Sequence, residues 1–253
     1  MGCAAAPAAE RSPSSARAPR EGETPGGVPE FHVLKFDRAG RFQALGPFAT
    51  ADYPGYGAAA DFDGDGDVDL ALSHAACNTP LTEISVNWNA GDGTFGPRTM
   101  LPAIWDQRPI AAGDLDGDGL PEIVVTGQKL GQWPICWFWY GGLVAVIRNL
   151  GEGRFGPPEI YELSYADRPW ALRLADMDRD GALDILAASA NFSKTTILWN
   201  DGTGRFPERV ETPGLPTDRL RAADFDGDGL LDILNSGCVT RNLGEGRFAE
   251  HVC

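Results

Sequence analysis

Short apolar stretches recur along this chain, and each begins directly after a segment of alternating acidic residues. The stretches lie at residues 70–72, 123–125, 185–187 and 233–234. A second short run, as at residues 171–175, comes before the acidic segment. Runs of this length, bounded by polar and glycine-rich residues, are typical of β-strands. We therefore predict two strands joined by an aspartate loop in each of four repeats.

A second motif, N-x-G-x-G-x-F, follows each apolar stretch after an intervening loop. It begins at Asn89, Asn149, Asn200 and Asn242, and the copy at Asn200 shifts its first glycine. Residues 37–42 are a fifth copy with no aspartate segment before it. Glycine-rich turns supply the positive φ angles that hairpins need. A third strand is therefore expected before each turn, and a fourth strand is expected to begin at its Phe.

The repeats predict an all-β chain. The first aspartates of successive loops are 53, 62 and 48 residues apart, a period that suits a four-stranded antiparallel blade. The predicted fold is a β-propeller of such blades, with four full repeats plus one half-blade at residues 31–50. The blade number stays open between four, five and a fragment of a larger ring. The 32 glycines and 19 prolines argue against long helices.

The acidic residues are concentrated in the aspartate loops. The formal net charge is −15, and the four loops hold 17 of the 36 acidic residues. Neighbouring carboxylates without a counter-charge destabilise a fold, so such clusters indicate bound cations. A basic partner is the alternative, although the regular spacing favours a cation. Nucleic acid is not expected as a partner, because the chain has no basic stripe that could neutralise phosphates.

Each loop places aspartates at positions one, three and five, glycine at position six and an acid at position nine. Ca²⁺ prefers several oxygen ligands from carboxylates, carbonyls and water, whereas Mg²⁺ demands strict octahedral geometry. Zn²⁺ would need His or Cys, which the loops lack. A metal-free Asp-Gly turn is the alternative, but four copies in phase favour about four Ca²⁺ ions. The expected ligands are the four acidic side chains and the position-seven carbonyl of each loop: Asp61, Asp63, Asp65, Asp67, Asp69, Asp114, Asp116, Asp118, Leu120, Glu122, Asp176, Asp178, Asp180, Ala182, Asp184, Asp224, Asp226, Asp228, Leu230 and Asp232.

With these motifs the chain resembles the FG-GAP/VCBS repeats, which also build integrin α-subunit propellers and some fungal lectins. The D-x-D-x-D-G-x-x-[DE] loops and the N-x-G-x-G-x-F turns carry the resemblance, which covers residues 31–253. It implies a propeller with one structural calcium per loop in a secreted or surface protein. It also implies a module that binds a protein or a glycan, as in cell adhesion or carbohydrate binding, and that is not an enzyme. Propellers of this family often have more blades than the repeats found here.

The alternative function is a hydrolase or lyase that uses the propeller channel. Paired carboxylates can be the catalytic acids of glycosidases, but the clustered acids of this chain are better explained as calcium ligands. The sequence contains no nucleophile elbow and no phosphate-binding loop. A recognition module is therefore the preferred interpretation.

Two groups of residues are candidates for ligand binding. The first is an aromatic insertion at residues 129–140, which either packs onto the propeller or forms a platform for a sugar ring or an apolar partner. The second is a set of arginines before the first strands, which either converge on an anion in the channel or pair with the aspartates that precede them. The candidate residues are Trp133, Trp137, Trp139, Tyr140, Arg108, Arg168 and Arg219.

The five cysteines suggest disulfides. Cys238 and Cys253 are nearly equidistant from the last turn, so a hairpin would set them opposite each other. Cys77 and Cys136 both fall in loops between the second and third strands, and this position suggests a second bridge, between neighbouring blades. Buried free thiols are the alternative for both pairs.

The N-terminus is expected to form a separate segment. Residues 1–30 contain almost nothing to bury and are predicted to be a disordered tether, with the propeller at residues 31–253. Cys3 follows Gly2, as in a mature bacterial lipoprotein, so we expect an extracytoplasmic protein that is secreted or held at the cell surface by a lipid on Cys3. A plain disordered tail is the alternative. Contact with a membrane is expected only through such a lipid.

Overall fold

The computed structural model describes residues 29–36, 41–51, 54–74, 83–104, 109–130, 139–164, 168–189, 194–213 and 219–253. Every regular element in these ranges is a β-strand, as the repeats predicted. Among the same residues, no helix has the length and apolar character needed to cross a membrane. Residues 1–28 of the expected tether lie outside the described part of the chain.

A two-stranded hairpin comes first and is followed by two four-stranded antiparallel sheets. The hairpin, called the half-blade below, contains β1 (Glu30–Phe36) and β2 (Phe42–Ala49). Blade 1 contains β3 (Pro54–Ala60), β4 (Asp69–His74), β5 (Glu83–Asn87) and β6 (Thr99–Pro102). Blade 2 contains β7 (Ile110–Gly113), β8 (Glu122–Leu130), β9 (Trp139–Asn149) and β10 (Phe155–Glu162).

Two further sheets complete the chain. Blade 3 contains β11 (Pro169–Ala175), β12 (Asp184–Ser189), β13 (Lys194–Trp199) and β14 (Glu208–Pro213). Blade 4 contains β15 (Leu220–Ala223), β16 (Asp232–Asn235) and β17 (Cys238–Thr240). An antiparallel bridge between Val239 and Val252 adds the start of a fourth strand to this blade. In every sheet, strands consecutive in sequence are neighbours in space.

These sheets confirm the predicted β-propeller of four-stranded blades. The half-blade also forms where it was expected, around the fifth copy of the turn motif. One local difference concerns the fourth strands. β10 begins at Phe155, whereas β6 begins at Thr99 and β14 at Glu208, a few residues after Phe95 and Phe206.

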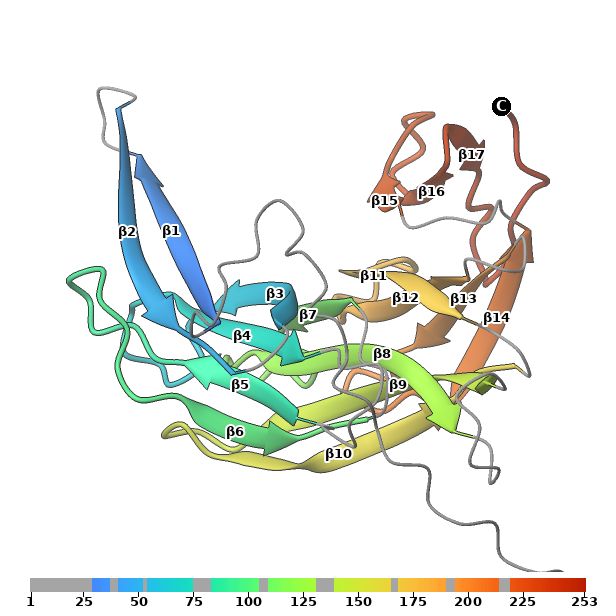
Figure 1. Ribbon diagram of the computed structural model, residues 1–253. Coiled ribbons are helices and arrows are strands. Elements are labelled where there is room, and N and C mark those ends of the chain that lie inside the picture. Colours follow the sequence, from blue (N-terminus) through green and yellow to red (C-terminus); the bar gives the residue numbers. More distant parts are fainter. Residues whose placement is uncertain are drawn as a thin grey trace, which may run out of the picture.

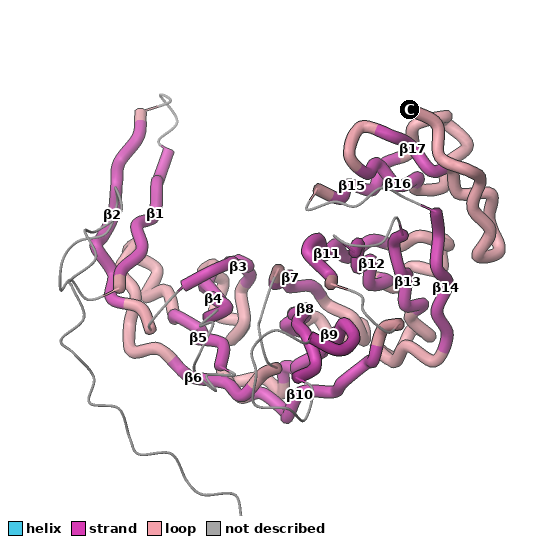
Figure 2. Tube along the Cα trace, turned by 45° about the vertical axis from the view of Figure 1, so that its right-hand side comes forward, coloured by secondary structure: helices cyan, strands magenta, loops and turns pink. Residues whose placement is uncertain are grey.

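The blades follow one another around an open arc (Figures 1 and 2). The first strands form its inner side, because β3 contacts β7, β7 contacts β11, and β11 contacts β15. Both views leave the half-blade and blade 4 at opposite ends of this arc. A cavity of about 460 Å³ lies between the half-blade and blade 1, lined by residues that include Leu45, Val68 and Asn89.

The hydrophobic core consists of three clusters, each between two consecutive blades. Alternate residues of one strand face different neighbours, as sheet geometry requires. Ile123 and Val125 of β8 pack toward blade 1, whereas Val124 packs toward blade 3. The third cluster joins blades 3 and 4 and includes Ile197 and Ile233. Blades 2 and 3 are therefore stabilised by a neighbour on each side.

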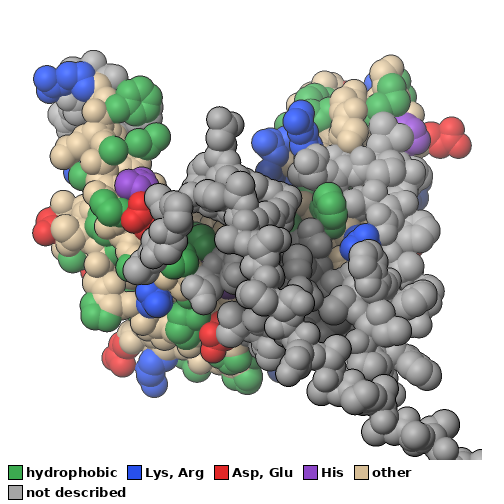
Figure 3. Space-filling model, viewed as in Figure 1, with side chains coloured by type: hydrophobic (Ala, Val, Ile, Leu, Met, Phe, Trp, Pro, Cys, Tyr) green, Lys and Arg blue, Asp and Glu red, His purple; other side chains and the backbone are tan. Residues whose placement is uncertain are grey.

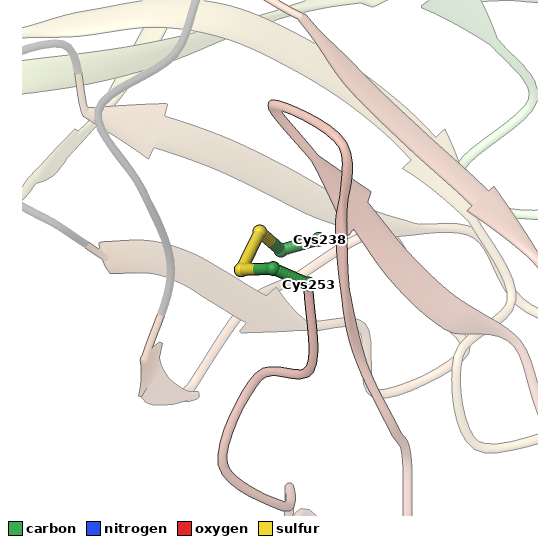
Figure 4. The surroundings of a disulfide bond; sticks show 2 residues. All are labelled: Cys238 and Cys253. Atoms are coloured by element: carbon green, nitrogen blue, oxygen red, sulfur yellow. A yellow bond between two sulfur atoms is a disulfide. The ribbon is translucent and has the colours of Figure 1, made fainter.

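A disulfide between Cys238 and Cys253 joins β17 to the end of the chain (Figure 4). The two residues are 15 positions apart, on either side of the last turn, as the hairpin pattern led us to expect. Disulfides persist in oxidising compartments, so this bridge indicates such an environment for the protein. The other suggested pair, Cys77 and Cys136, lies outside the described residues.

Candidate metal sites in the aspartate loops

The four aspartate loops connect the first and second strands of each blade. Loop 1 covers residues 61–69, loop 2 covers 114–122, loop 3 covers 176–184 and loop 4 covers 224–232. In each loop, three acidic side chains offer oxygen atoms that all lie within 4.8 Å of one another. The groups are formed by positions one, three and nine: Asp61, Asp63 and Asp69; Asp114, Asp116 and Glu122; Asp176, Asp178 and Asp184; Asp224, Asp226 and Asp232.

The position-one aspartate organises the loop. In loop 1 its two oxygens accept hydrogen bonds from the backbone N–H groups of Gly64 and Gly66, at 2.8 and 2.9 Å. The other three loops repeat both bonds. Gly66 has a φ of 93°, a conformation that side chains rarely adopt. The glycine at position six is therefore required for the tight curvature that brings the carboxylates together.

The position-nine acid is buried and joins each loop to the turn of the same blade. Asp184 is fully buried. Its Oδ2 accepts a hydrogen bond from Met177 N at 2.9 Å, and its Oδ1 accepts one from Asn200 N, also at 2.9 Å. Asp69, Glu122 and Asp232 have equivalent partners. This acid therefore closes the loop and fixes the turn against it.

Burial makes these acids unusually hard to ionise without a counter-charge. Desolvation, with a smaller contribution from neighbouring aspartates, raises the pKa of Asp184 to about 6 and that of Glu122 to about 7. The pKa of Asp69 is also raised, chiefly by desolvation. A divalent cation would lower these pKa values again, because an opposite charge at short range favours the ionised form. The donor set of each loop fits a hard, oxygen-preferring cation such as Ca²⁺.

The position-five aspartates differ from the predicted ligand set. Asp65, Asp118, Asp180 and Asp228 are not members of the three-carboxylate groups. In each of them, Oδ1 accepts a hydrogen bond from the position-seven N–H at 2.8 to 2.9 Å. The structure thus brings together three of the four predicted side chains in every loop. The position-five side chains and the position-seven carbonyls stay predicted ligands.

The first Asn of the turn motif has a role that the sequence did not reveal. Asn149 Nδ2 donates to Phe62 O of blade 1 at 2.8 Å and to Pro121 O of its own blade. Asn200 and Asn242 make the same pair of bonds, to Leu115 O and Met177 O of the preceding blade. These asparagines therefore fasten each turn to the loop of the blade before it. Their fixed place in the four complete copies of the motif was the available signal.

The side chains of most candidate ligand residues lie outside the described part of the structure. Trp133, Trp137 and Arg108 lie outside it, and only the backbones of Trp139 and Tyr140, in β9, are described. Arg168 precedes β11, and its Nε is buried without a hydrogen-bond partner. Arg219 precedes β15 and is exposed. Arg168 and Arg219 are thus the only two whose side chains the described ranges contain.

A different pair of arginines lies on the inner strands. Arg173 of β11 and Arg221 of β15 are both exposed and occupy the same place in their blades, three residues before the first loop aspartate. They pair with equivalent leucines, Leu186 and Leu234. Partial burial, followed by the charge of Arg221, lowers the pKa of Arg173. Figure 3 shows Lys and Arg side chains gathered on the inner side of this end of the arc.

These two arginines have no acidic partner among the described residues. Arg173 Nη1 donates to Leu172 O and Arg221 Nη1 donates to Leu220 O, which are carbonyls of their own strands. Two like charges on adjacent strands leave a local positive field in a chain of net charge −15. The sequence did not reveal the pair, because the equivalent positions in blades 1 and 2 are the alanines Ala58 and Ala111.

No curated protein matches the chain by sequence. Three solved structures resemble it: the exotype rhamnogalacturonan lyase YesX (TM-score 0.49, 18% identity), the rhamnogalacturonan lyase YesW (0.48, 17%) and the Bacillus licheniformis rhamnogalacturonan lyase PL11 (0.44, 17%). The matches cover 89%, 87% and 74% of this chain but only 44%, 44% and 40% of those structures. The chain thus spans less than half of their length.

One expectation from the sequence is corrected by these structures. The chain was predicted not to be an enzyme, yet all three similar structures are lyases. At these identities the likeness concerns the architecture alone.

The family assignment rests on the repeats themselves. The FG-GAP-like repeat family matches the chain three times in succession, at residues 75–125, 135–187 and 184–234. These matches cover more than half of the sequence, and they include the whole of loops 2, 3 and 4. The resemblance inferred from the aspartate loops and the glycine turns is thereby confirmed. This chain belongs to the FG-GAP-like repeat family.

Proposed function

We propose that this chain is an extracytoplasmic recognition domain whose four loops bind calcium and whose inner strands bind an anionic partner. The observation that carries the calcium part is the repetition of one three-carboxylate group in all four loops. Each group includes a buried acid whose charge a cation would balance. In this proposal, calcium holds each loop closed and so stabilises the blades.

The disulfide between Cys238 and Cys253 supports a location outside the cytoplasm. Secretion or a lipid on Cys3 would both place the domain there. The partner is a glycan or a protein surface that carries carboxylates. Arg173 and Arg221 would be its contacts, since guanidinium groups bind carboxylates through paired, charge-assisted hydrogen bonds.

A glycan-binding experiment tests the arginine pair. The probe is polygalacturonate, which carries a carboxylate on every sugar, and the comparison is neutral dextran of similar length, both in calcium. We expect binding of the acidic polymer only, and a loss of about tenfold or more in affinity when Arg173 and Arg221 are both changed to Ala, because charged hydrogen bonds are worth about 1.5–3 kcal/mol each. Isothermal titration calorimetry measures the affinity of the wild type and of the double variant for each polymer.

The matched control is Arg154→Ala. Arg154 lies on the turn of blade 2, is exposed and pairs with Glu152, so its removal should leave the affinity unchanged. Equal affinity for both polymers, or an unaffected double variant, would contradict the anionic site. An assay for new reducing ends in the same samples tests for cleavage of the polymer. Cleavage by the wild type that is lost in the double variant would identify a hydrolase or lyase acting in the channel.

A further inference from the structure

The residue that precedes the first Asn of the turn motif alternates between two kinds of side chain. It is an arginine in blades 2 and 4 and a tryptophan in blades 1 and 3: Arg148, Arg241, Trp88 and Trp199. Each arginine pairs with the position-three aspartate of its own loop. Arg148 Nη1 lies 3.6 Å from Asp116 Oδ2, and Arg241 Nε lies 3.7 Å from an oxygen of the blade 4 aspartate. Among the described residues, the equivalent aspartates of blades 1 and 3 have no such partner.

Arg148 shows what the space beside this position accepts. Its guanidinium group reaches from blade 2 to the turn of blade 3, where Nη2 donates a hydrogen bond to Gly204 O. The same group binds Glu159 of β10, with Nε and Nη2 each 3.2 Å from a carboxylate oxygen. The side chain of Arg148 is only 14% exposed. A loop aspartate, a carbonyl of the following turn and an acid of the fourth strand thus surround one guanidinium group.

The equivalent space between blades 3 and 4 is a cavity of about 380 Å³. Its lining includes the counterparts of the groups that hold the blade 2 arginine. Asp178 has the loop position of Asp116, and Gly246 has the turn position of Gly204. Trp199 lines the cavity from the position that the arginine has in blade 2. None of the described residues that line this cavity is a Lys or an Arg.

The lining of the cavity is strongly acidic. It contains four carboxylates, those of Asp178, Asp201, Glu208 and Glu245. Asp178 and Glu208 have no basic partner among the residues that the structure describes. In blade 1, which also carries a tryptophan before its turn, the positions of Asp201 and Glu208 are taken by Ala90 and Pro97. Blade 3 therefore combines a tryptophan with an acidic wall, and it lacks the cation that the same place holds in blade 2.

We propose that this cavity binds the guanidinium group of an arginine side chain from a partner protein. Carboxylates bind guanidinium groups through paired, charge-assisted hydrogen bonds. The ring of Trp199 would stack on the planar group, a contact that arginine favours. The partner would thus supply from outside the group that Arg148 supplies within the chain. This site is separate from Arg173 and Arg221, whose charge selects the opposite kind of ligand.

The site is compatible with a cation in loop 3, although Asp178 is also a predicted metal ligand. Asp116 belongs to the three-carboxylate group of loop 2 and still pairs with Arg148. A position-three aspartate therefore has room for both interactions, because its two oxygens can bind different groups.

The acidic lining also favours an arginine within a chain over the free amino acid. Free arginine carries an α-carboxylate, which the like charges of the lining would repel. An arginine inside a peptide has only the charge of its guanidinium group. The side chain of Glu245 is 88% exposed, so the cavity is accessible from solvent at the turn of blade 4. The ligand class is therefore a protein segment that presents an arginine.

A titration followed by NMR, in calcium, tests the proposal. The probe is an acetylated and amidated tripeptide with one arginine between two glycines, and the protein is labelled with ¹⁵N. We expect a saturable shift of the Trp199 indole N–H signal, which is assigned by its absence in Trp199→Phe. The same tripeptide with citrulline, which has a similar shape without the charge, should bind at least about tenfold more weakly. Equal affinity for the two peptides, no saturable shift, or tighter binding of free arginine than of the peptide would overturn the proposal.

A pair of double variants tests the acidic wall without changing a predicted calcium ligand. Asp201→Asn with Glu208→Gln should weaken peptide binding at least about threefold, since exposed ion pairs are weak individually. Asp92→Asn with Glu152→Gln removes the same charge from the turns of blades 1 and 2 and should leave the affinity unchanged. Equal losses from both double variants would show an effect of net charge alone and would contradict the site.

Trp199→Arg tests the comparison with blade 2 directly. The new guanidinium group should occupy the cavity as Arg148 occupies its counterpart, and it should weaken peptide binding at least about tenfold through exclusion and like charge. The control is Trp88→Arg, the same change in blade 1, which should leave the affinity unchanged. NMR signals of the peptide report binding in both variants, and thermal unfolding in calcium verifies that each is folded. Wild-type affinity in Trp199→Arg would refute the proposal, and the acidic-wall variants keep the test valid if this variant does not fold.

Discussion

Removal of calcium is expected to lower the thermal stability of this chain strongly and to loosen all four blades. A site that is filled at one hundred times its dissociation constant stabilises the folded state by about 2.7 kcal/mol, so four sites contribute roughly 11 kcal/mol. The net stability of a typical domain is about 5–15 kcal/mol. Buried acids such as Asp184 and Glu122 would then lack a counter-charge. Thermal unfolding in excess calcium and in excess chelator measures the difference.

A single loop can be disabled as an internal control. Changing Asp114 and Asp116 to Asn removes two carboxylates of loop 2 and leaves the other three loops intact. The calcium-dependent gain in melting temperature should then fall by about a quarter, and titration calorimetry should count three sites where the wild type has four. Magnesium at equal concentration should stabilise less, because these loops do not offer strict octahedral geometry. A melting temperature that changes with neither chelator nor calcium would contradict the calcium sites.

Much of the fold could be predicted from the sequence because its signals are local. The glycine at position six, as at Gly66, can adopt the backbone conformation that the loop requires. The apolar stretch after each loop marks the buried second strand, such as β12. Because the same local chemistry recurs four times, the repeat predicted the blades, the loops and the turns together. The pair formed by Cys238 and Cys253 followed from the symmetry of one hairpin.

The features that the sequence did not reveal depend on neighbouring blades. Phe62 and Phe225 occupy the same position in nearly identical loops, yet one is fully buried and the other half-exposed. Among the described residues, the turn of blade 2 packs on loop 1 and no turn packs on loop 4, and this contact makes the difference. Arg173 and Arg221 likewise become a pair only because β11 and β15 are adjacent inner strands. The burial of Phe62 and the pairing of the two arginines both depend on residues far apart in sequence, so no local sequence pattern indicates them.

The interblade asparagines lead to the second prediction with a large effect. Asn200 is 5% exposed and makes four bonds: Nδ2 donates to Leu115 O and Leu183 O, and Oδ1 accepts from Gly202 N and Gly204 N. Asn200→Ala removes the partner of Leu115 O and Gly204 N, whose bonds to Asn200 are buried, and of Leu183 O and Gly202 N, whose bonds are partly buried. Each unsatisfied buried group costs about 1–3 kcal/mol, so we expect a loss of roughly 3 kcal/mol or more in the free energy of unfolding. Urea denaturation in calcium measures it.

Asn89 provides the matched control for this prediction. It begins the same motif in blade 1, but it faces the cavity beside the half-blade, where no described residue of the half-blade accepts a hydrogen bond from it. Asn89 is only half-buried, and its side chain bonds Val68 O and Gly91 N of its own blade. Asn89→Ala should therefore cost only about 1 kcal/mol, the net worth of an ordinary hydrogen bond.

A change to aspartate separates the hydrogen bonds from the shape of the side chain. Asn200→Asp keeps the size of the residue and its acceptor for the two glycine N–H groups, but it replaces the donor with a carboxylate oxygen that faces Leu115 O and Leu183 O. Loss of two donated bonds together with burial of a charge should destabilise at least as much as the alanine change. Asn89→Asp, which is more exposed, should lose far less. If the variants at the two positions lost equal stability, the asparagine would serve only its own turn, and the fastening between blades would have to come from apolar packing alone.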